Sequence, residues 1–247
     1  MRFSVRHLTV FVFAAVLLSA CAVIPMQPSG LVVEDALGRT VTFESIPQRI
    51  VIAGKANFML NNAVYLFPQA TERVVGLTKA RQNQGFLELI EPNADEKLRF
   101  TVESSAEEIA AAQPDLVILK SFMEKQIGST LESLGFPVVY LDLETPEQYR
   151  RDIAVLGQIF QDEARAEEVI AFYDERLARI RTRLEENEVA QPDALVLQHD
   201  SRGEDVAFEA PPPNWIQTWM LEFSGATPVW ESEAAGGWTI VNLEQIA

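Results

Sequence analysis

The stretch EARAEEVIAFYDERLARIRTRLEEN, residues 163–187, decides the fold because it predicts one unusually long amphipathic helix. Its apolar residues recur at steps of three and four, which is the spacing of a single helical face. They are Ala166, Ile170, Tyr173, Leu177, Ile180 and Leu184. At 1.5 Å per residue this helix extends about 37 Å. A helix of this length can join two lobes instead of only covering one sheet.

Short, nearly continuous apolar runs come before this helix and are typical of buried parallel strands. They occupy 49–54, 73–78, 115–119 and 137–142. Helix-like stretches separate the strands at 57–66, 85–91, 105–112 and 124–134, and a further amphipathic helix is predicted at 146–160. The alternation predicts a parallel sheet covered by helices on both faces. Residues 31–160, which begin with a predicted small hairpin, are therefore expected to form an N-terminal α/β lobe.

The α/β pattern restarts after the long helix, which we assign to an interlobe segment over 161–190. A strand is predicted at 193–198, a helix around 214–224 and another strand at 225–230. The sequence ends on VNLEQIA, residues 241–247, which repeats the Glu-x-Ile-Ala of AEEIAAAQPDLVIL, residues 106–119. We therefore expect residues 191–247 to be a partial C-terminal α/β lobe, in a chain that is truncated before this lobe is complete.

The N-terminus predicts an exported lipoprotein. A short basic segment, MRFSVRH, precedes an apolar run over 8–18, which suits a secretory signal better than a permanent transmembrane helix. The sequence LSAC, residues 18–21, resembles the bacterial lipoprotein processing box and contains the only cysteine. The resemblance implies that residues 1–20 are removed and that Cys21 is lipidated. Residues 21–30 then form a flexible tether between the membrane and the folded lobes.

Composition excludes several classes of function. Acidic residues outnumber basic ones by 36 to 20, so the formal net charge is −16. Nucleic acid is therefore not expected as a partner, because phosphate binding needs a concentrated cationic face. With Cys21 lipidated, no thiol remains for a disulfide, a zinc site or a nucleophile.

Five stretches carry a resemblance to a known family. They are DALGRTVTFESIPQRIVIAG, SSAEEIAAAQPDLVIL, LGFPVVYLDLETPEQYRRDIAVLGQIF, ARAEEVIAFYDERLARI and WTIVNLEQIA. In this order they resemble the periplasmic substrate-binding proteins of ABC importers for iron–siderophore complexes, haem and cobalamin. The resemblance implies two Rossmann-like lobes with parallel sheets, joined by one rigid helix. It also implies a ligand held between the lobes, an ABC importer permease dimer as partner, and neither catalysis nor a resident cofactor.

Four cations follow three consecutive predicted strands of the first lobe. Because ligands bind beyond the carboxyl ends of parallel strands, we expect these cations to converge at one edge of the sheet. They are Lys55, Lys79, Arg81 and Lys120, and the neighbouring side chains that complete the predicted site are Asn57, Phe58, Gln82 and Phe122. Such a cluster in an acidic protein favours an anionic ligand through charge-assisted hydrogen bonds.

In the second lobe, the candidate ligand contacts are His199, Arg202, Trp215 and Trp238. Tryptophans in loops are suited to stacking on a planar chelate or macrocycle. Two glutamates, Glu107 and Glu244, occupy equivalent positions in the two Glu-x-Ile repeats. The resemblance implies that each docks onto arginines of the permease, and a glutamate in the first turn of a helix also stabilises the helix dipole.

Several alternatives stay open. The leading hypothesis is a lipid-anchored protein of the cell envelope that captures a ferric siderophore or a similar anionic chelate. Haem, cobalamin and bare metal ions are alternative ligands for the same architecture, although His7 and His199 are the only histidines and exclude a histidine-rich metal site. A secreted α/β hydrolase is a remote alternative, because the sequence contains no Gly-x-Ser-x-Gly elbow.

Overall fold

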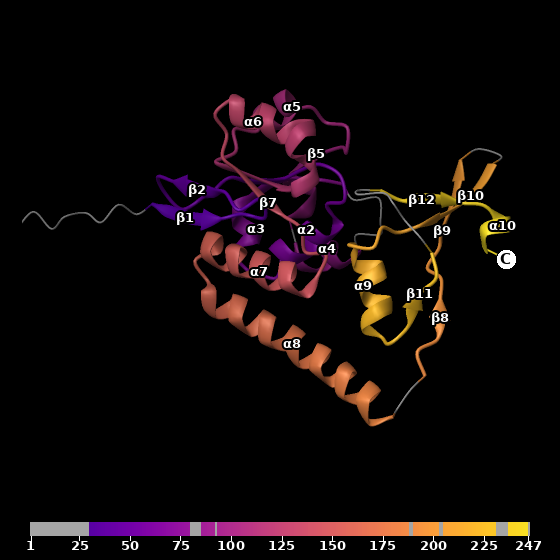
Figure 1. The fold of residues 1–247 in the computed structure, drawn as a ribbon. Coiled ribbons are helices and arrows are strands. Elements are labelled where there is room, and N and C mark those ends of the chain that lie inside the picture. Colours follow the sequence, from indigo (N-terminus) through magenta and orange to yellow (C-terminus); the bar gives the residue numbers. More distant parts are fainter. Residues whose placement is uncertain are drawn as a thin grey trace, which may run out of the picture.

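The computed structural model describes residues 30–79, 85–91, 93–187, 190–202, 205–230 and 237–246. The predicted signal over 1–20, Cys21 and most of the tether lie outside these residues. The described part contains a first α/β lobe, a long helix and a smaller second lobe that lies beside the first (Figure 1). None of its helices is long and apolar enough to cross a membrane.

A five-stranded parallel sheet forms the centre of the first lobe. Its strand order is β5-β4-β3-β6-β7, and its strands are Ile50–Ile52 (β3), Val74–Thr78 (β4), Leu98–Phe100 (β5), Leu116–Lys120 (β6) and Val138–Leu141 (β7). Four of these strands match the predicted apolar runs. The short edge strand β5 was not predicted, because only three residues form it and two of them are exposed.

Both faces of this sheet are covered, as the alternation predicted. Strand residues of one parity, such as Ile52 and Ile118, pack with the helices Phe58–Val64 (α2) and Pro146–Phe160 (α7). Residues of the other parity, such as Val51 and Leu119, pack with Ala106–Ala110 (α5) and Ser129–Ser133 (α6). The lobe also contains the short α-helices Ala70–Arg73 (α3) and Gly85–Ile90 (α4), the 3-10 helices Ala94–Glu96 (η2) and Ser121–Met123 (η3), and a π-helical turn, Glu124–Gly128 (η4), directly before α6.

Two short antiparallel strands, Leu31–Glu34 (β1) and Thr40–Phe43 (β2), form the predicted hairpin. Asp35 is buried in its turn and accepts hydrogen bonds from the backbone N–H groups of Leu37 and Arg39. The Arg39 guanidinium pairs with Asp35 and Glu132 and lies 4.4 Å from the centre of the Tyr140 ring. These partners raise the pKa of Arg39 against the opposing effect of burial. The hairpin is therefore tied to β7 and α6.

The Pro-Asp pair before β6 aligns two neighbouring strands of the sheet. The Asp115 carboxylate accepts hydrogen bonds of 2.7 and 2.8 Å from the backbone N–H groups of Gln48 and Arg49. The Asp115 N–H in turn donates to the Arg49 carbonyl. Asp115 therefore links the beginning of β6 to the segment that leads into β3, and fixes their parallel register.

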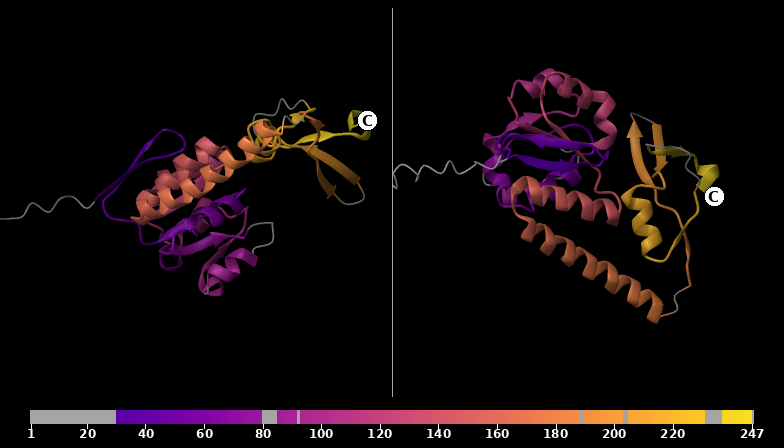
Figure 2. Two further views of the ribbon diagram at one scale, coloured as in Figure 1. Left: turned by 90° about the horizontal axis from the view of Figure 1, so that it is seen from below. Right: turned by 60° about the vertical axis from the view of Figure 1, so that its left-hand side comes forward.

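The two longest helices lie against each other. Helix α7 covers the predicted residues 146–160 and begins with a capping box, in which Thr145 caps the N–H of Gln148 and Gln148 returns the bond. The long helix α8 is Glu163–Glu186, one residue shorter than predicted. Its first half packs on α7, and its far end reaches the second lobe, where Leu184 lies against Gly225 (Figure 2). Helix α8 thus joins the two lobes, as its length predicted.

The second lobe differs from the parallel sheet that the sequence led us to expect. Its main sheet is antiparallel, in the order β12-β10-β9. A parallel pair, β11-β8, contains only two residues in each strand. The elements of this lobe are Asp193–Ala194 (β8), Gln198–Arg202 (β9), Asp205–Ala210 (β10), Ile216–Phe223 (α9), Thr227–Pro228 (β11), Thr239–Val241 (β12) and Leu243–Ile246 (α10).

Candidate functional site

The carboxyl edge of the first sheet carries the predicted cations on neighbouring strands. Lys79 follows β4, Lys55 follows β3 and Lys120 ends β6, and these three strands are adjacent in the sheet. The sheet order therefore brings together three of the four cations that sequence spacing selected. The fourth, Arg81, lies outside the described residues together with Gln82.

Two of these cations are accessible. The Lys55 side chain is 49% exposed, and its ammonium lies 3.9 Å from a carboxylate oxygen of Glu103, which is 78% exposed. An exposed pair at this distance contributes little to stability and leaves the ammonium free to exchange partners. The Lys79 side chain is exposed, while its backbone N–H donates to the Phe100 carbonyl and extends the β4–β5 ladder.

Lys120 was also expected to be accessible to a ligand, but the structure buries it. Its side chain is only 2% exposed, and its ammonium donates to the Asp142 carbonyl and, at 2.6 Å, to Glu144 Oε1. Burial of a charge is tolerated here because the charge has a carboxylate partner and a second hydrogen bond. The Lys120 charge is thus compensated inside the protein. Its spacing after β6 did not reveal this partner, which lies 24 residues further along the chain.

The other predicted neighbours divide into structural and accessible side chains. Asn57 is buried and its amide donates to the Thr78 carbonyl, so it fastens the beginning of α2 to the end of β4. Phe58 is half-buried in the first turn of α2, whereas Phe122 is exposed just after β6. Asn57 therefore has a structural role and does not provide the polar ligand contact that was predicted. Phe122 is accessible for apolar contact beside the lysines.

Glu144 connects this edge to the second lobe, and sequence reasoning missed it. Its second carboxylate oxygen accepts a 3.2 Å hydrogen bond from the backbone N–H of Ile216, the first residue of α9. The same edge rule that selected the lysines also selects Glu144, because it follows β7 by three residues.

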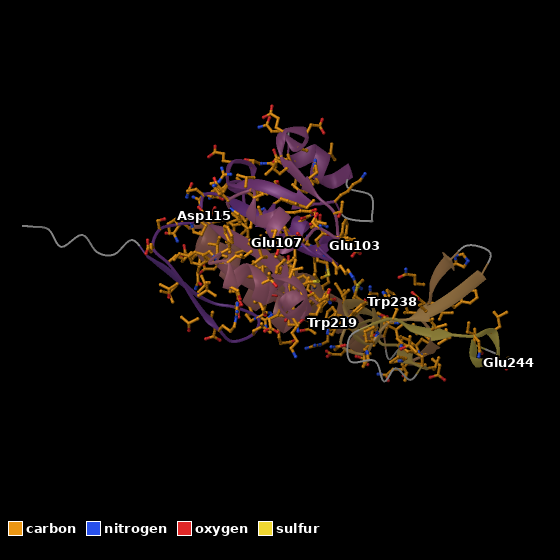
Figure 3. All side chains as sticks on the ribbon, turned by 90° about the horizontal axis from the view of Figure 1, so that it is seen from above. Glu103, Glu107, Asp115, Trp219, Trp238 and Glu244 are labelled. Carbon is orange, nitrogen blue, oxygen red and sulfur yellow. The ribbon has the colours of Figure 1, made fainter. Side chains whose placement is uncertain are left out.

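Aromatic side chains gather in the part of the second lobe that follows this contact. The Trp215 and Trp238 rings meet edge to face, with centroids 5.8 Å apart. Trp219 stacks on Phe223 within α9, and the Trp230 indole N–H donates to the Pro211 carbonyl. The structure therefore brings together the two tryptophans that the sequence selected. Figure 3 places Trp219 and Trp238 near the boundary between the lobes.

The remaining candidates of the second lobe lie on strand β9. His199 is exposed, and its ring meets Phe208 edge to face at 5.9 Å. Arg202 ends the same strand, and its side chain lies outside what the structure describes. No cluster of three or more His, Cys, Asp or Glu side chains among the described residues is arranged to hold a metal ion.

An apolar hollow of about 370 Å³ opens on the first lobe between α2 and α7. Met59, Asn62 and Ala63 of α2 line one side together with Leu66, which follows the helix, while Leu143 and Tyr149 line the opposite side. Leu143 is the residue before Glu144. The hollow therefore begins next to the link between the lobes.

The two predicted docking glutamates are both exposed and both lie in the first turn of a short helix. Ser105 caps α5, and hydrogen bonds from the Glu107 backbone N–H and the Ser105 side chain lower the pKa of Glu107. In Figure 3, Glu107 lies on the first lobe and Glu244 lies at the far end of the second lobe. Of the two predicted docking glutamates, one is therefore accessible on the first lobe and the other on the second.

Comparisons with known proteins agree with this architecture. A crystal structure of the TroA-like periplasmic binding protein FepB from Veillonella parvula superposes with a TM-score of 0.67 at 18% identity, over 87% of this chain and 66% of that one. The siderophore-binding protein BauB, bound to ferric iron and two acinetobactin molecules, gives 0.63 at 19% identity, over 88% and 72%. A periplasmic haem-binding protein from Pseudomonas aeruginosa gives 0.63 at 20% identity, over 81% and 68%.

At these identities the solved structures establish a shared fold, and this chain spans about two thirds of the length of each. No curated protein matches the chain by sequence. The family model described as periplasmic binding protein matches residues 72–247, which include most of the first sheet, the long helix and the second lobe. The chain therefore belongs to the periplasmic binding protein family.

Proposed function

We propose that this protein captures an anionic metal chelate of the ferric siderophore type and delivers it to an ABC importer. One observation carries the proposal: the sheet edge that presents Lys55, Lys79 and Phe122 joins the tryptophan-bearing lobe through the Glu144–Ile216 hydrogen bond. The lysines supply charge for anionic groups of a chelate. The aromatic side chains supply flat apolar surface for its ligand rings.

The solved structures support this class of ligand by analogy. BauB is described with a ferric siderophore bound, and the Pseudomonas aeruginosa protein is described as binding haem. The accessible cations favour an anionic chelate over neutral cobalamin. Recognition of a complete chelate also needs no protein side chain on the iron, so the binding step requires no catalytic residue.

The ligand class is tested by intrinsic tryptophan fluorescence of the full chain. The titrants are ferric complexes of a catecholate, a hydroxamate and citrate, together with haem, cobalamin and bare Fe³⁺, Zn²⁺ and Mn²⁺ salts. We expect saturable quenching by at least one anionic ferric complex and none by cobalamin. Quenching by cobalamin alone, or by bare metal ions alone, would rule out the proposed ligand class.

Haem is a second candidate, favoured by the exposed imidazole of His199. An axial ligand is the usual requirement for haem. A Soret shift on haem addition that disappears in His199→Ala, together with no response to ferric siderophores, would favour haem over the siderophore class.

We further propose that Glu107 and Glu244 contact the permease, one from each lobe. Their exposure supports this role, as does their position on separate lobes. Photocrosslinking residues placed at 107 and at 244 in cells should each trap a membrane permease subunit, identified by mass spectrometry. A crosslinker at the exposed position 125 is the matched control. Equal trapping of permease from position 125 would contradict the assignment.

The proposed location is the cell envelope, with Cys21 as the lipid-modified residue. Incorporation of labelled fatty acid into the wild-type protein and its loss in Cys21→Ser would support this anchor. Equal incorporation in both proteins would exclude Cys21 as the modified residue.

A further inference from the structure

We infer that Glu144 is a positioning residue that fixes the tryptophan-bearing helix α9 against the carboxyl edge of the first sheet. It does so as an N-cap supplied from the opposite lobe. The inference about position stands on geometry alone, whereas its consequence for binding rests on the proposed function.

Helix α9 receives no cap from its own sequence among the described residues. Its N-cap residue is Trp215, whose side chain makes no capping hydrogen bond, and its first turn contains no acid. The first N–H groups of a helix need partners, and a carboxylate there also interacts favourably with the helix dipole. Glu144 places a carboxylate at this helix end and provides a partner for the first of these groups, because its Oε2 accepts from the Ile216 N–H at 3.2 Å.

Contacts within the first lobe fix the position of the Glu144 side chain. Its Oε1 lies 2.6 Å from the ammonium of Lys120, the buried last residue of β6. Its backbone N–H donates to the side-chain oxygen of Gln148, which belongs to the capping box of α7. Because both the backbone N–H and one carboxylate oxygen of Glu144 are held, its side chain has little freedom to move. It can therefore transmit the position of the first sheet to α9.

The segment beside Glu144 is also rigidly placed. Asp152 is buried, and its carboxylate accepts from the backbone N–H groups of Asp142 and Leu143 at 2.6 and 2.8 Å. Arg151 bridges the Asp142 and Asp152 side chains. The loop from β7 to α7 is thus fixed just before Glu144, and just after it the Thr145 N–H donates to the Gln148 side-chain oxygen.

Fixing Ile216 also fixes the aromatic residue directly before it in the chain. Trp215 immediately precedes Ile216, and its ring meets Trp238, which leads into β12. Fixing the Ile216 N–H therefore fixes the distance between this tryptophan pair and the lysines of the first sheet. A ligand that contacts both groups depends on that distance, so loss of Glu144 weakens its binding even though all proposed contact residues remain.

The position is tested without ligand by pulsed electron paramagnetic resonance. Spin labels are attached to Thr130→Cys on α6 and Glu222→Cys on α9, both exposed positions, in a Cys21→Ser background. We expect one narrow interlobe distance that becomes broad in Glu144→Ala and broadens less in Glu144→Gln, which keeps one acceptor oxygen. Glu147→Ala, in the first turn of α7 and 80% exposed, is the matched control and should leave the distance unchanged.

A Glu144→Ala distribution as narrow as that of wild type would overturn the inference. If Glu144→Ala does not fold, as judged by circular dichroism, Glu144→Gln decides by the same criterion. The binding consequence is then read from tryptophan quenching by ferric citrate, which should need about tenfold more titrant in Glu144→Ala. Absence of quenching in wild type by any titrant counts against the proposed function only, because the distance measurement needs no ligand.

Discussion

The Lys120 ammonium and the Glu144 carboxylate form a 2.6 Å ion pair, and the second oxygen of that carboxylate accepts from the first N–H of α9. One carboxylate therefore serves a buried charge of the first lobe and a helix end of the second. The same pair removes Lys120 from the set of cations available to a ligand.

The two partners of this pair should be strongly coupled in stability. Glu144→Leu leaves a buried, unpaired ammonium, and breaking a buried pair in this way typically costs about 3–5 kcal/mol. Lys120→Met should cost less, because Glu144 is 17% exposed and keeps its bond to Ile216. The double variant should recover most of the loss, since apolar replacement of a buried pair is often neutral. Urea unfolding of all four proteins measures the coupling, and additive losses would contradict it.

Gly128 should tolerate no side chain, because an added Cβ meets the Tyr140 hydroxyl and ring. Gly128→Ala is expected to lower the free energy of unfolding by about 1–3 kcal/mol, as overpacking does. Tyr140→Phe removes the hydroxyl, which is buried and has no hydrogen-bond partner among the described residues, and should restore part of this loss. Gly237→Ala, where a Cβ has open space, is the control. Equal unfolding midpoints for Gly128→Ala and wild type would disprove this account of the packing.

Glu107 should titrate below the ordinary range of glutamate, because its own backbone N–H and Ser105 lower its pKa. Between the lowered folded pKa and the ordinary unfolded pKa, the unfolded chain binds more protons, so stability rises with pH across this window. The contribution is lost as pH falls through the folded pKa. Carboxyl NMR titration measures the pKa directly, and Ser105→Ala should raise it. An unchanged Glu107 pKa in that variant would refute the Ser105 contribution.

The second lobe should open more readily than the first. Among the described residues after 190, the buried apolar ones are Ala210, Pro211 and Pro212, while Met220, Ile240 and Leu243 are each more than half exposed. Regions with few buried apolar contacts open at low free energy. Hydrogen exchange monitored by mass spectrometry should therefore show faster exchange in α9 and β12 than in β3 and β6. Equal protection of Ile216–Phe223 and Leu116–Lys120 would contradict this expectation.

The first lobe could be predicted from sequence because burial and periodicity agree there. Helix α7 begins at Pro146 after the capping residue Thr145, and both signals are local. The strands β3 and β7 consist of apolar and aromatic residues, and β6 is apolar up to its last residue, Lys120, so their buried pattern is visible without any knowledge of pairing. The order of the sheet then brought Lys55 and Lys79 to one edge, as the rule for parallel strands requires.

The second lobe and the interlobe contact could not be predicted in the same way. The strand Gln198–Arg202 is polar throughout, so no apolar pattern indicates it. It pairs with β10 through backbone hydrogen bonds, which the residue types do not reveal. The Lys120–Glu144 pair joins the last residue of β6 to a loop residue 24 positions later, beyond the reach of helical or strand periodicity. The Glu144–Ile216 bond spans 72 residues. Such contacts depend on how the completed lobes meet.

The most direct test of the central claim compares ferric citrate binding by wild type and by the charge-reversal variant Lys55→Glu/Lys79→Glu, using isothermal titration calorimetry. Lys125→Glu, which reverses an exposed lysine at another place on the first lobe, is the control for charge reversal away from the sheet edge. We predict saturable binding in wild type and in Lys125→Glu, and a loss of about tenfold or more in the double variant. Equal affinities in all three proteins would contradict the claim that the accessible lysines at the sheet edge hold an anionic chelate.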